Sequence, residues 1–309
     1  MRSRALDYNT PTLKKKQKLI VIVGPTSSGK SSLAIEIAKQ FDGEVISADS
    51  RQVYKGLDIG TGKVTEREKR GVKHHMLDVV APKRTFTAHY FVVEAQKAIN
   101  DVVSRRKISI ICGGTGFYID ALLGRIQLSQ VAANSKLRAQ LDKKSAADLF
   151  AQLAKIDPNR ASNIDRNNKR RLIRALEIAK SKSTRPGRLN LPGFDCLWIG
   201  LKTTPKDLRS RINARLHKRL RHGMVAEAKR LHAGGLSYKR MHELGLEYRS
   251  LARLLKGETS RAALEDELQK AIWQYSRRQM TYWRRNKDIQ WFHPKKGRRI
   301  AQIVAKWLN

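Results

Sequence analysis

The segment KLIVIVGPTSSGKS, residues 18–31, joins an apolar run to a glycine-rich turn. Residues 24–31 match G-x-x-x-x-G-K-[S/T], a phosphate-binding pattern that is meaningful only between a buried strand and a helix. The β-branched run 18–23 predicts that strand. After the turn, apolar side chains recur every four residues from Leu33 to Phe41, as on one face of a helix. The pattern has its required setting, so we expect a phosphate-binding loop in an α/β domain.

The residues of this loop are suited to an anion. Its glycines let the backbone wrap around a phosphate, and its amides and the following helix N-terminus supply positive potential. Lys30 adds a mobile charge, and the Ser31 hydroxyl can bind a Mg²⁺ ion that bridges phosphate oxygens. The expected phosphate-binding residues are Gly24, Pro25, Thr26, Ser27, Ser28, Gly29, Lys30 and Ser31, with Ser31 as the expected metal ligand.

Further strands follow the loop. Apolar runs at 44–48, 76–80 and 108–112 predict them, and a helical pattern at 91–105 precedes the last. Strands that alternate with helices at this spacing indicate a parallel sheet covered by helices on both faces.

A carboxylate follows the second of these strands. Asp49 comes directly after 44–48, whereas 108–112 continues into glycines without the Asp that common P-loop hydrolases use to hold a metal. Ligands of α/β sheets bind at the carboxyl ends of the strands, so Asp49 would face the phosphate loop. It could take a proton from an incoming nucleophile, or it could cap a turn or a helix. Spacing alone leaves both interpretations open.

The middle of the chain differs in character. Between 126 and 188 the pattern is helical and basic, with 15 Lys and Arg residues against 5 Asp and Glu residues. The stretch STRPGRLNLP at 183–192 is typical of a linker, 196–201 resumes strand character, and the chain beyond Pro205 is helical. The predicted domains are a P-loop core with C-terminal helices, residues 1–125 and 190–309, and a helical insertion, residues 126–189.

Composition indicates a polyanionic partner. The chain has 309 residues with 64 Lys and Arg against 27 Asp and Glu, a net charge of +37, which attracts nucleic acid and releases its counterions. No apolar run approaches the roughly 18 residues of a membrane span, and the N-terminus lacks the apolar stretch of a secretory signal. We expect a cytoplasmic protein that does not enter membranes, with Cys112 and Cys196 as buried free thiols.

An aromatic and basic segment lies near the C-terminus. Residues 273–285, WQYSRRQMTYWRR, could stack on nucleobases. At helical spacing, however, Ile272, Ser276, Gln279 and Trp283 share one face, so we expect Trp283 in the core. His74 and His75 lack partners at metal-ligand spacing, and we expect them to be structural or to contact RNA.

Several blocks together resemble one family. They are GPTSSGKS at 24–31, ISADSRQVYKGLDIGT at 46–61, the His74-His75 pair, GGTGFY at 113–118, RRLIRALE at 170–177 and the stretch 211–215. In this order they resemble tRNA dimethylallyltransferases, also called tRNA isopentenyltransferases, of the bacterial type. The resemblance runs from about Leu19 to Phe292, and the long block at 46–61 is its most specific part.

The resemblance implies a fold like that of P-loop nucleotide kinases, with the loop holding dimethylallyl diphosphate instead of a nucleotide. Residues 26–31 would cradle the diphosphate, and Arg215 would add charge. Asp49 would accept the proton of the adenine N6 amine, and Thr115 would contact substrate near the reacting centre. The implied catalytic residues are Asp49, Thr115, Lys30 and Arg215.

The resemblance also implies a tRNA partner, modified at adenosine 37 beside the anticodon in tRNAs that read codons beginning with U. The implied tRNA contacts are Asp49, Ser50, Arg51, Gln52 and Thr115 in the core, and Arg138, Arg170, Arg171, Leu172, Ile173 and Arg174 in the insertion. Dimethylallyl diphosphate is the implied donor, Mg²⁺ the implied cofactor and a monomer the implied form.

Three other functions share some of these features. A small-molecule P-loop kinase would explain the loop but not the charge or the helical insertion. An enzyme that prenylates free adenylate would not need a basic insertion. An RNA-binding protein with a relic loop would have no reason to keep Lys30, Ser31 and Asp49 together.

Overall fold

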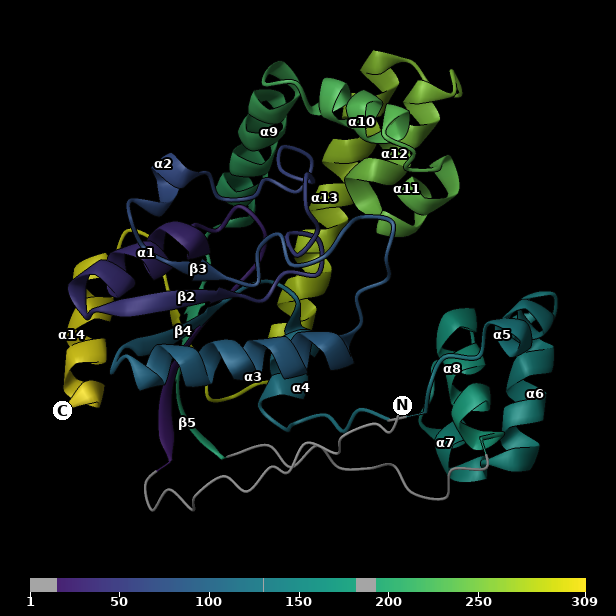
Figure 1. Cartoon of the computed structure of the whole chain (residues 1–309), viewed down its shortest axis with the longest axis horizontal. Helices are drawn as coiled ribbons and strands as arrows, with labels where there is room; N and C mark the ends of the chain where they lie inside the picture. Colours follow the sequence, from purple (N-terminus) through teal and green to yellow (C-terminus); the bar gives the residue numbers. More distant parts are fainter. Residues whose placement is uncertain (1–15, 130, 182–192) are drawn as a thin grey trace, which may run out of the picture. The chain divides into compact units, whose positions relative to one another are not determined.

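The computed structural model describes residues 16–129, 131–181 and 193–309, and it contains a six-stranded parallel sheet (Figure 1). The strands are β1 (Gln17–Val23), β2 (Gly43–Ser47), β3 (His74–His75), β4 (Ile108–Cys112), β5 (Phe194–Leu201) and β6 (Gln290–Phe292). Their order across the sheet is β3-β2-β4-β1-β5-β6. Because β1 pairs with β4 and β5, the phosphate loop that follows β1 lies near the middle of the carboxyl edge.

Helices cover both faces of this sheet. Alternation along β1 sends its side chains to opposite faces. Ile20 and Ile22 pack in one apolar core with α1 (Lys30–Gln40) and α14 (Gly297–Leu308). The other face carries α3 (Ala88–Ser104), which contacts β2 and β4, and α4 (Gly116–Leu122), which contacts α3 (Figure 1). The predicted parallel α/β architecture is confirmed.

One predicted strand is misplaced. The expected strand at 76–80 is instead the two-residue β3, which pairs with β2. Met76 and Asp78 have φ angles of 66° and 55°. A left-handed backbone at these positions is incompatible with a strand, so the apolar pattern of this segment is misleading. Farther along, Val80 forms an isolated parallel bridge with Tyr54.

The edge strand β6 goes unpredicted. Its three residues are half-buried or exposed, which is too short a run to give an alternating pattern. It pairs with β5 and extends the sheet beyond the expected last strand. The predicted elements at 18–23, 31–41, 44–48, 91–105, 108–112 and 196–201 all form, with ends that differ by at most three residues.

The C-terminal part of the core is helical, as predicted. Its helices are α9 (Pro205–Arg221), α10 (Met224–Ala233), α11 (Tyr238–Leu244), α12 (Leu246–Leu255) and α13 (Arg261–Trp283), and a short α2 (Glu66–Lys69) follows β2. Helices α9 to α13 enclose a second apolar core that also includes Val53 and Leu57. Trp283 is 1% exposed, and its predicted companions on α13 are buried as well, so the core interpretation of this tryptophan is confirmed.

The basic middle segment forms a separate unit. Contacts along the backbone divide the chain into residues 1–126 with 191–309, and residues 127–190. The second unit contains α5 (Ser135–Asp142), α6 (Ala146–Ile156), α7 (Pro158–Ser162) and α8 (Lys169–Ala179). These helices surround a small core of their own, built largely from leucines such as Leu149, Leu153 and Leu172. The predicted linker at 183–192 lies outside the described residues.

The two cysteines are free thiols. Cys112 is buried as predicted, whereas Cys196 is only half-buried. Burial raises the pKa of both thiols to about 11. In the described part of the chain, every helix is too short or too polar to span a bilayer.

Candidate active site

The phosphate loop connects β1 to α1 by a backbone path that needs glycine. Gly24 has a φ of 143°, and a Cβ atom there would lie 2.5 Å from the Leu201 carbonyl oxygen. Gly29, with a φ of 97°, precedes the first residue of α1. The Lys30 ammonium folds back and donates to the Pro25 carbonyl at 2.6 Å. The predicted residues 24–31 therefore form one closed loop at the N-terminus of α1.

Lys30 carries its charge in a buried setting. Burial lowers the pKa of its ammonium to about 8. The positive charge of Arg215 acts in the same direction, while interactions with Cys112 and Asp49 oppose it. An arriving polyanion would stabilise the charged form of Lys30, because opposite charge favours the ionised state.

Asp49 follows β2 and lies near these cations. Its Oδ1 accepts hydrogen bonds from the backbone N–H groups of Arg51 and Gln52, at 2.8 and 3.2 Å. Its charge also interacts with Lys30 and Arg215. The turn-cap interpretation of Asp49 is confirmed. Since both bonds use Oδ1, the cap leaves Oδ2 free of these contacts and does not compete with a role toward substrate.

The loops after β2 and β4 are fastened to each other at Thr115. Its hydroxyl accepts a hydrogen bond from the Ser50 N–H at 3.1 Å, and its own N–H donates to the Ala48 carbonyl at 3.1 Å. A Cβ at Gly113 would lie 2.1 Å from that same carbonyl, so the close approach requires glycine. The predicted block 49–52 and Thr115 thus lie together.

Arg215 projects from α9 toward the same region. Its Nη2 donates to the Gly62 carbonyl at 2.6 Å, and burial lowers the pKa of its guanidinium. One helical turn later, Arg219 donates to the Gly60 carbonyl at 2.7 Å. The two arginines therefore hold the carbonyl groups of one loop, residues 58–62, against α9.

The backbone N–H groups of the same loop, residues 58–62, donate to a buried carboxylate. Glu227, on α10, accepts from the N–H groups of Asp58, Ile59 and Gly60 at 3.0, 2.7 and 2.9 Å. The Tyr248 hydroxyl donates to it at 2.6 Å. Sequence reasoning misses Glu227 and Tyr248. The only sign of the former is an acidic residue among the apolar positions of a helix.

The predicted cations of the insertion form their own cluster. Arg138 donates through Nε and Nη2 to Glu177 at 2.9 and 2.7 Å, and Arg174 also pairs with Glu177. Leu172 and Ile173 are buried in the unit's core, at 0% and 8% exposure, so their side chains do not form part of its surface. Arg170 and Arg171 are exposed.

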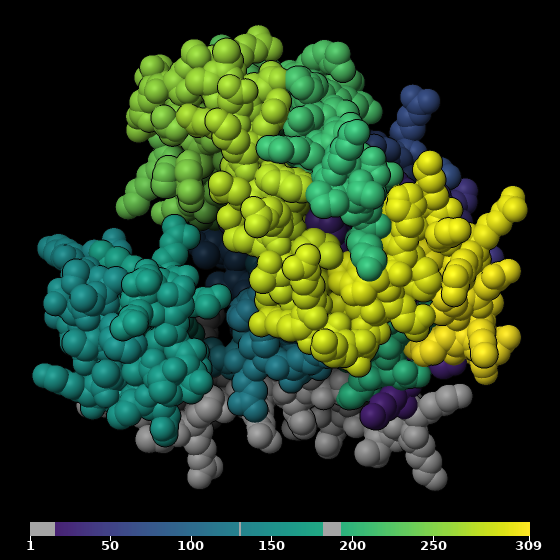
Figure 2. Space-filling view, turned by 180° about the vertical axis from the view of Figure 1, so that it is seen from behind, coloured from purple at the N-terminus to yellow at the C-terminus, as the bar shows by residue number. Residues whose placement is uncertain are grey.

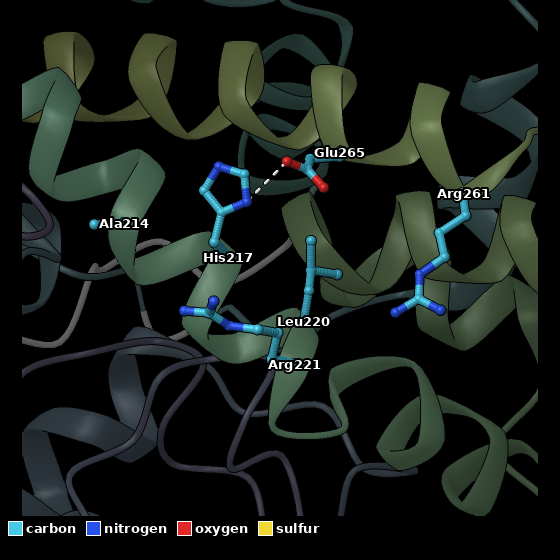
Figure 3. A pocket seen from close by; sticks show the side chains of 6 residues that line it. All are labelled: Ala214, His217, Leu220, Arg221, Arg261 and Glu265. Carbon is cyan, nitrogen blue, oxygen red and sulfur yellow. Dashed lines mark ion pairs between the residues drawn. The ribbon is translucent and has the colours of Figure 1, made fainter.

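The helical part of the core also has a groove. It runs between α9 and α13, two helices in contact at the surface shown in Figure 2. One pocket of about 420 Å³ contains the ion pair of His217 with Glu265, whose Nδ1 and Oε1 are 2.9 Å apart (Figure 3). None of the predicted site residues lines it.

Comparisons with known proteins agree on one family. The family model described as IPP transferase matches residues 52–286. The tRNA dimethylallyltransferase of Leuconostoc citreum is 38% identical over 94% of this chain and 99% of its own length. The tRNA dimethylallyltransferase 1 of Geotalea daltonii is 41% identical over 86% of both chains.

Solved structures agree. The tRNA isopentenylpyrophosphate transferase of Bacillus halodurans superposes with a TM-score of 0.72 at 33% identity, covering 94% of this chain and 96% of its own. A eukaryotic dimethylallyltransferase, solved as crystallographic snapshots of its action on tRNA, gives a TM-score of 0.81 at 26% identity and covers 94% and 79%. The chain therefore belongs to the IPP transferase family.

Proposed function

We propose that the chain transfers the dimethylallyl group of dimethylallyl diphosphate to the exocyclic amine of an adenosine in tRNA. The observation that carries this proposal is the meeting of a phosphate loop with a carboxylate. Lys30, Arg215 and Asp49 interact electrostatically at the carboxyl edge of the sheet. Membership of the IPP transferase family supports the same reaction.

Lys30 and Arg215 would stabilise the negative charge of the diphosphate leaving group. When the allylic C–O bond breaks, positive charge spreads over the allyl group and the diphosphate takes the electron pair. Hydrogen bonds to the Pro25 and Gly62 carbonyls hold Lys30 and Arg215 in place before the donor binds, so these cations and the loop amides would stabilise that charge with little reorganisation. Exclusion of water would protect the allyl cation from hydrolysis.

Mg²⁺ would bind at this site together with the diphosphate of the donor substrate. Among the described residues, no cluster of three His, Cys, Asp or Glu side chains could hold a metal. The ion would therefore be held by the Ser31 hydroxyl and the diphosphate oxygens, a mode that suits Mg²⁺ because it retains several waters. Bound there, it would neutralise part of the diphosphate charge.

Asp49 would act on the acceptor substrate, the adenine amine. The adenine amine is a weak nucleophile because its lone pair is delocalised into the ring. Oδ2 of Asp49 would orient this amine and accept its proton as the new N–C bond forms, while Oδ1 keeps the turn closed. General-base catalysis of this kind contributes about 10²- to 10⁴-fold to rate.

The tRNA would be held by both units. We place the target at adenosine 37 in tRNAs that read codons beginning with U, with the base turned out of its stack at a cost of a few kcal/mol. Residues 50–52 would contact the anticodon loop. Arg138, Arg170, Arg171 and Arg174 would contact phosphates, which position RNA without reading its sequence. We further propose that the protein acts as a cytoplasmic monomer.

The test is nucleoside mass spectrometry of unmodified tRNA incubated with the enzyme, Mg²⁺ and dimethylallyl diphosphate. The wild type should yield prenylated adenosine. Asp49→Asn is the informative variant, because the amide oxygen can still cap the turn but the side chain cannot accept a proton. We expect at least about a 100-fold loss of rate with tRNA binding retained. Phosphate transfer from ATP without prenylation would instead establish the kinase alternative.

A further inference from the structure

One side chain joins the two loops that the proposed reaction uses. Gln279 lies on α13 and is 6% exposed. Its amide oxygen accepts a hydrogen bond from the Thr26 N–H of the phosphate loop at 2.8 Å. Its amide nitrogen donates to the Gly114 carbonyl, in the loop before Thr115, at 3.1 Å. One primary amide therefore links the donor side of the site to the acceptor side.

The Gln279 amide packs closely against the loop after β4. A Cβ atom at Gly114 would lie 2.1 Å from the Gln279 nitrogen, so any larger residue there would displace it. One turn later on α13, the Tyr282 ring packs against Gly116, where a Cβ atom would lie only 2.2 Å from the ring. The Tyr282 hydroxyl donates a hydrogen bond to Asp120. This face of α13 thus fixes the loop after β4 at several points.

The bond to Thr26 also assigns the amides of the phosphate loop. Pro25 has no N–H, and the Thr26 N–H is engaged by Gln279. The Ser28 N–H donates to the Pro25 carbonyl at 3.3 Å, so among residues 25–28 the Ser27 N–H is the one left to face an anion. Gln279 fixes the start of the loop, and Thr115, one residue after Gly114, accepts from Ser50 beside Asp49. Gln279 therefore adds a side-chain link between the phosphate cradle and the base, beside backbone links of the sheet such as the Gly113 N–H to the Ile22 carbonyl.

We propose that Gln279 is a positioning residue that sets the distance between the bound diphosphate and the carboxylate of Asp49. The inference rests on the proposed prenyl transfer. An error of about 1 Å in such a distance can reduce the rate by roughly 100-fold without loss of binding. Gln279 should therefore govern the chemical step and leave tRNA affinity unchanged.

The direct test uses Gln279→Met, which keeps the length of the side chain and removes both hydrogen bonds. Single-turnover prenylation at saturating substrates should slow by about 10- to 100-fold. The dissociation constant for tRNA, measured by filter binding, should stay within twofold. Gln274→Met is the matched control, because Gln274 is exposed on the same helix, and it should match the wild type.

A second variant separates positioning from folding. Gln279→Glu keeps the oxygen that accepts from Thr26, but as a carboxylate it cannot donate to Gly114. Protonation restores a donor, so the variant's rate divided by the wild-type rate should rise as the pH falls from 8 to 5.5. Dividing by the wild-type rate removes the pH effects that both enzymes share.

The outcomes are distinct. Slow transfer by Gln279→Met with intact tRNA binding, and a pH-dependent rate ratio for Gln279→Glu, support the inference. It is overturned if Gln279→Met transfers within twofold of the wild type. A flat ratio for a folded Gln279→Glu would also overturn it. If the wild type itself forms no prenylated adenosine, the proposed function has failed rather than the role of Gln279.

Discussion

Each unit of the molecule contains a buried glutamate that accepts hydrogen bonds from several donors, but Glu227 and Glu177 hold different partners. In the core, Glu227 accepts from three backbone amides and a tyrosine hydroxyl, so it fixes the course of a loop. In the insertion, Glu177 accepts from Arg138, Arg174 and the Asn134 amide, so it fixes the orientation of cations. The arrangement around Glu227 suits an active site, where the positions of loops must be exact. The arrangement around Glu177 suits a surface whose arginines contact RNA phosphates.

The electrostatics of Glu177 follow from this arrangement. Burial alone would raise the pKa of its carboxyl. The hydrogen bonds from Arg138, Asn134 and Arg174 outweigh burial and lower the pKa to about 2. At neutral pH the carboxylate therefore stays ionised, and it keeps both arginines in place while offsetting part of their charge.

The largest effect should come from removing the core carboxylate. Glu227→Ala would leave three amides and the Tyr248 hydroxyl without their acceptor and would release the loop that Arg215 holds. We expect kcat/KM for prenylation to fall by at least about 100-fold, together with a lower Tm. Steady-state kinetics and thermal unfolding would measure both. Tyr248→Phe removes only one of the four bonds and should cost about 1 kcal/mol of stability; equal damage from both variants would contradict a loop-fixing role.

The corresponding change in the insertion should act on binding rather than on chemistry. Glu177→Gln keeps the shape of the side chain but removes the charge that orients Arg138 and Arg174. We expect the dissociation constant for tRNA to rise by about 3- to 10-fold, which corresponds to about 1 kcal/mol, the scale of one ordinary hydrogen bond. The KM for dimethylallyl diphosphate should not change. Tighter tRNA binding by this variant would show that net charge matters more than orientation.

Alkaline pH should affect the core site through Lys30. Its folded pKa is lowered to about 8, so the ammonium loses its proton as the pH rises through that value. The kcat/KM for the diphosphate donor should therefore decline above about pH 8. A bound polyanion favours the charged lysine, so kcat should hold to higher pH. Between pH 8 and 10.5 the unfolded chain binds more protons at this residue, so its contribution to the free energy of unfolding rises with pH. A profile of kcat/KM that is flat from pH 7 to 10 would rule out this role for Lys30.

The smallest effect concerns the exposed cations of α8. Arg170→Ala and Arg171→Ala each remove a surface charge without disturbing the core of the insertion. Each should weaken tRNA binding slightly and reduce the slope of log K against log salt by about 0.7 to 0.9 if it contacts a phosphate. Titrations at several salt concentrations would show the slope. Leu172→Ala is the contrasting variant, because its side chain is fully buried and its loss should lower stability by about 2–5 kcal/mol.

What could be predicted from the sequence was local. The loop at 24–31 and Asp49 each follow a recognisable strand, and the carboxyl edge of a parallel sheet brings them together. Trp283 was assignable to the core because its helical companions share a face. In each case the signal lies within a few residues of the side chain concerned.

What could not be predicted depends on distant pairs. Gln279 and Thr26 are 253 positions apart, and Glu227 and Ile59 are 168 apart. No periodicity or short motif connects such residues, because their contact exists only after the helices of the C-terminal part have packed. The misplaced strand at 76–80 has another cause. This segment has the apolar residues of a strand, but the left-handed backbone at Met76 and Asp78 prevents it from continuing as one.

The hydrogen bond from Lys30 to the Pro25 carbonyl has a consequence for turnover. An ammonium has three N–H donors, so Lys30 can keep this bond and still donate to an anion in the loop. The carbonyl then holds the lysine in one position both before the diphosphate donor arrives and after the diphosphate product leaves. The empty site therefore keeps its positive charge in place for the next donor without ordering a long side chain again.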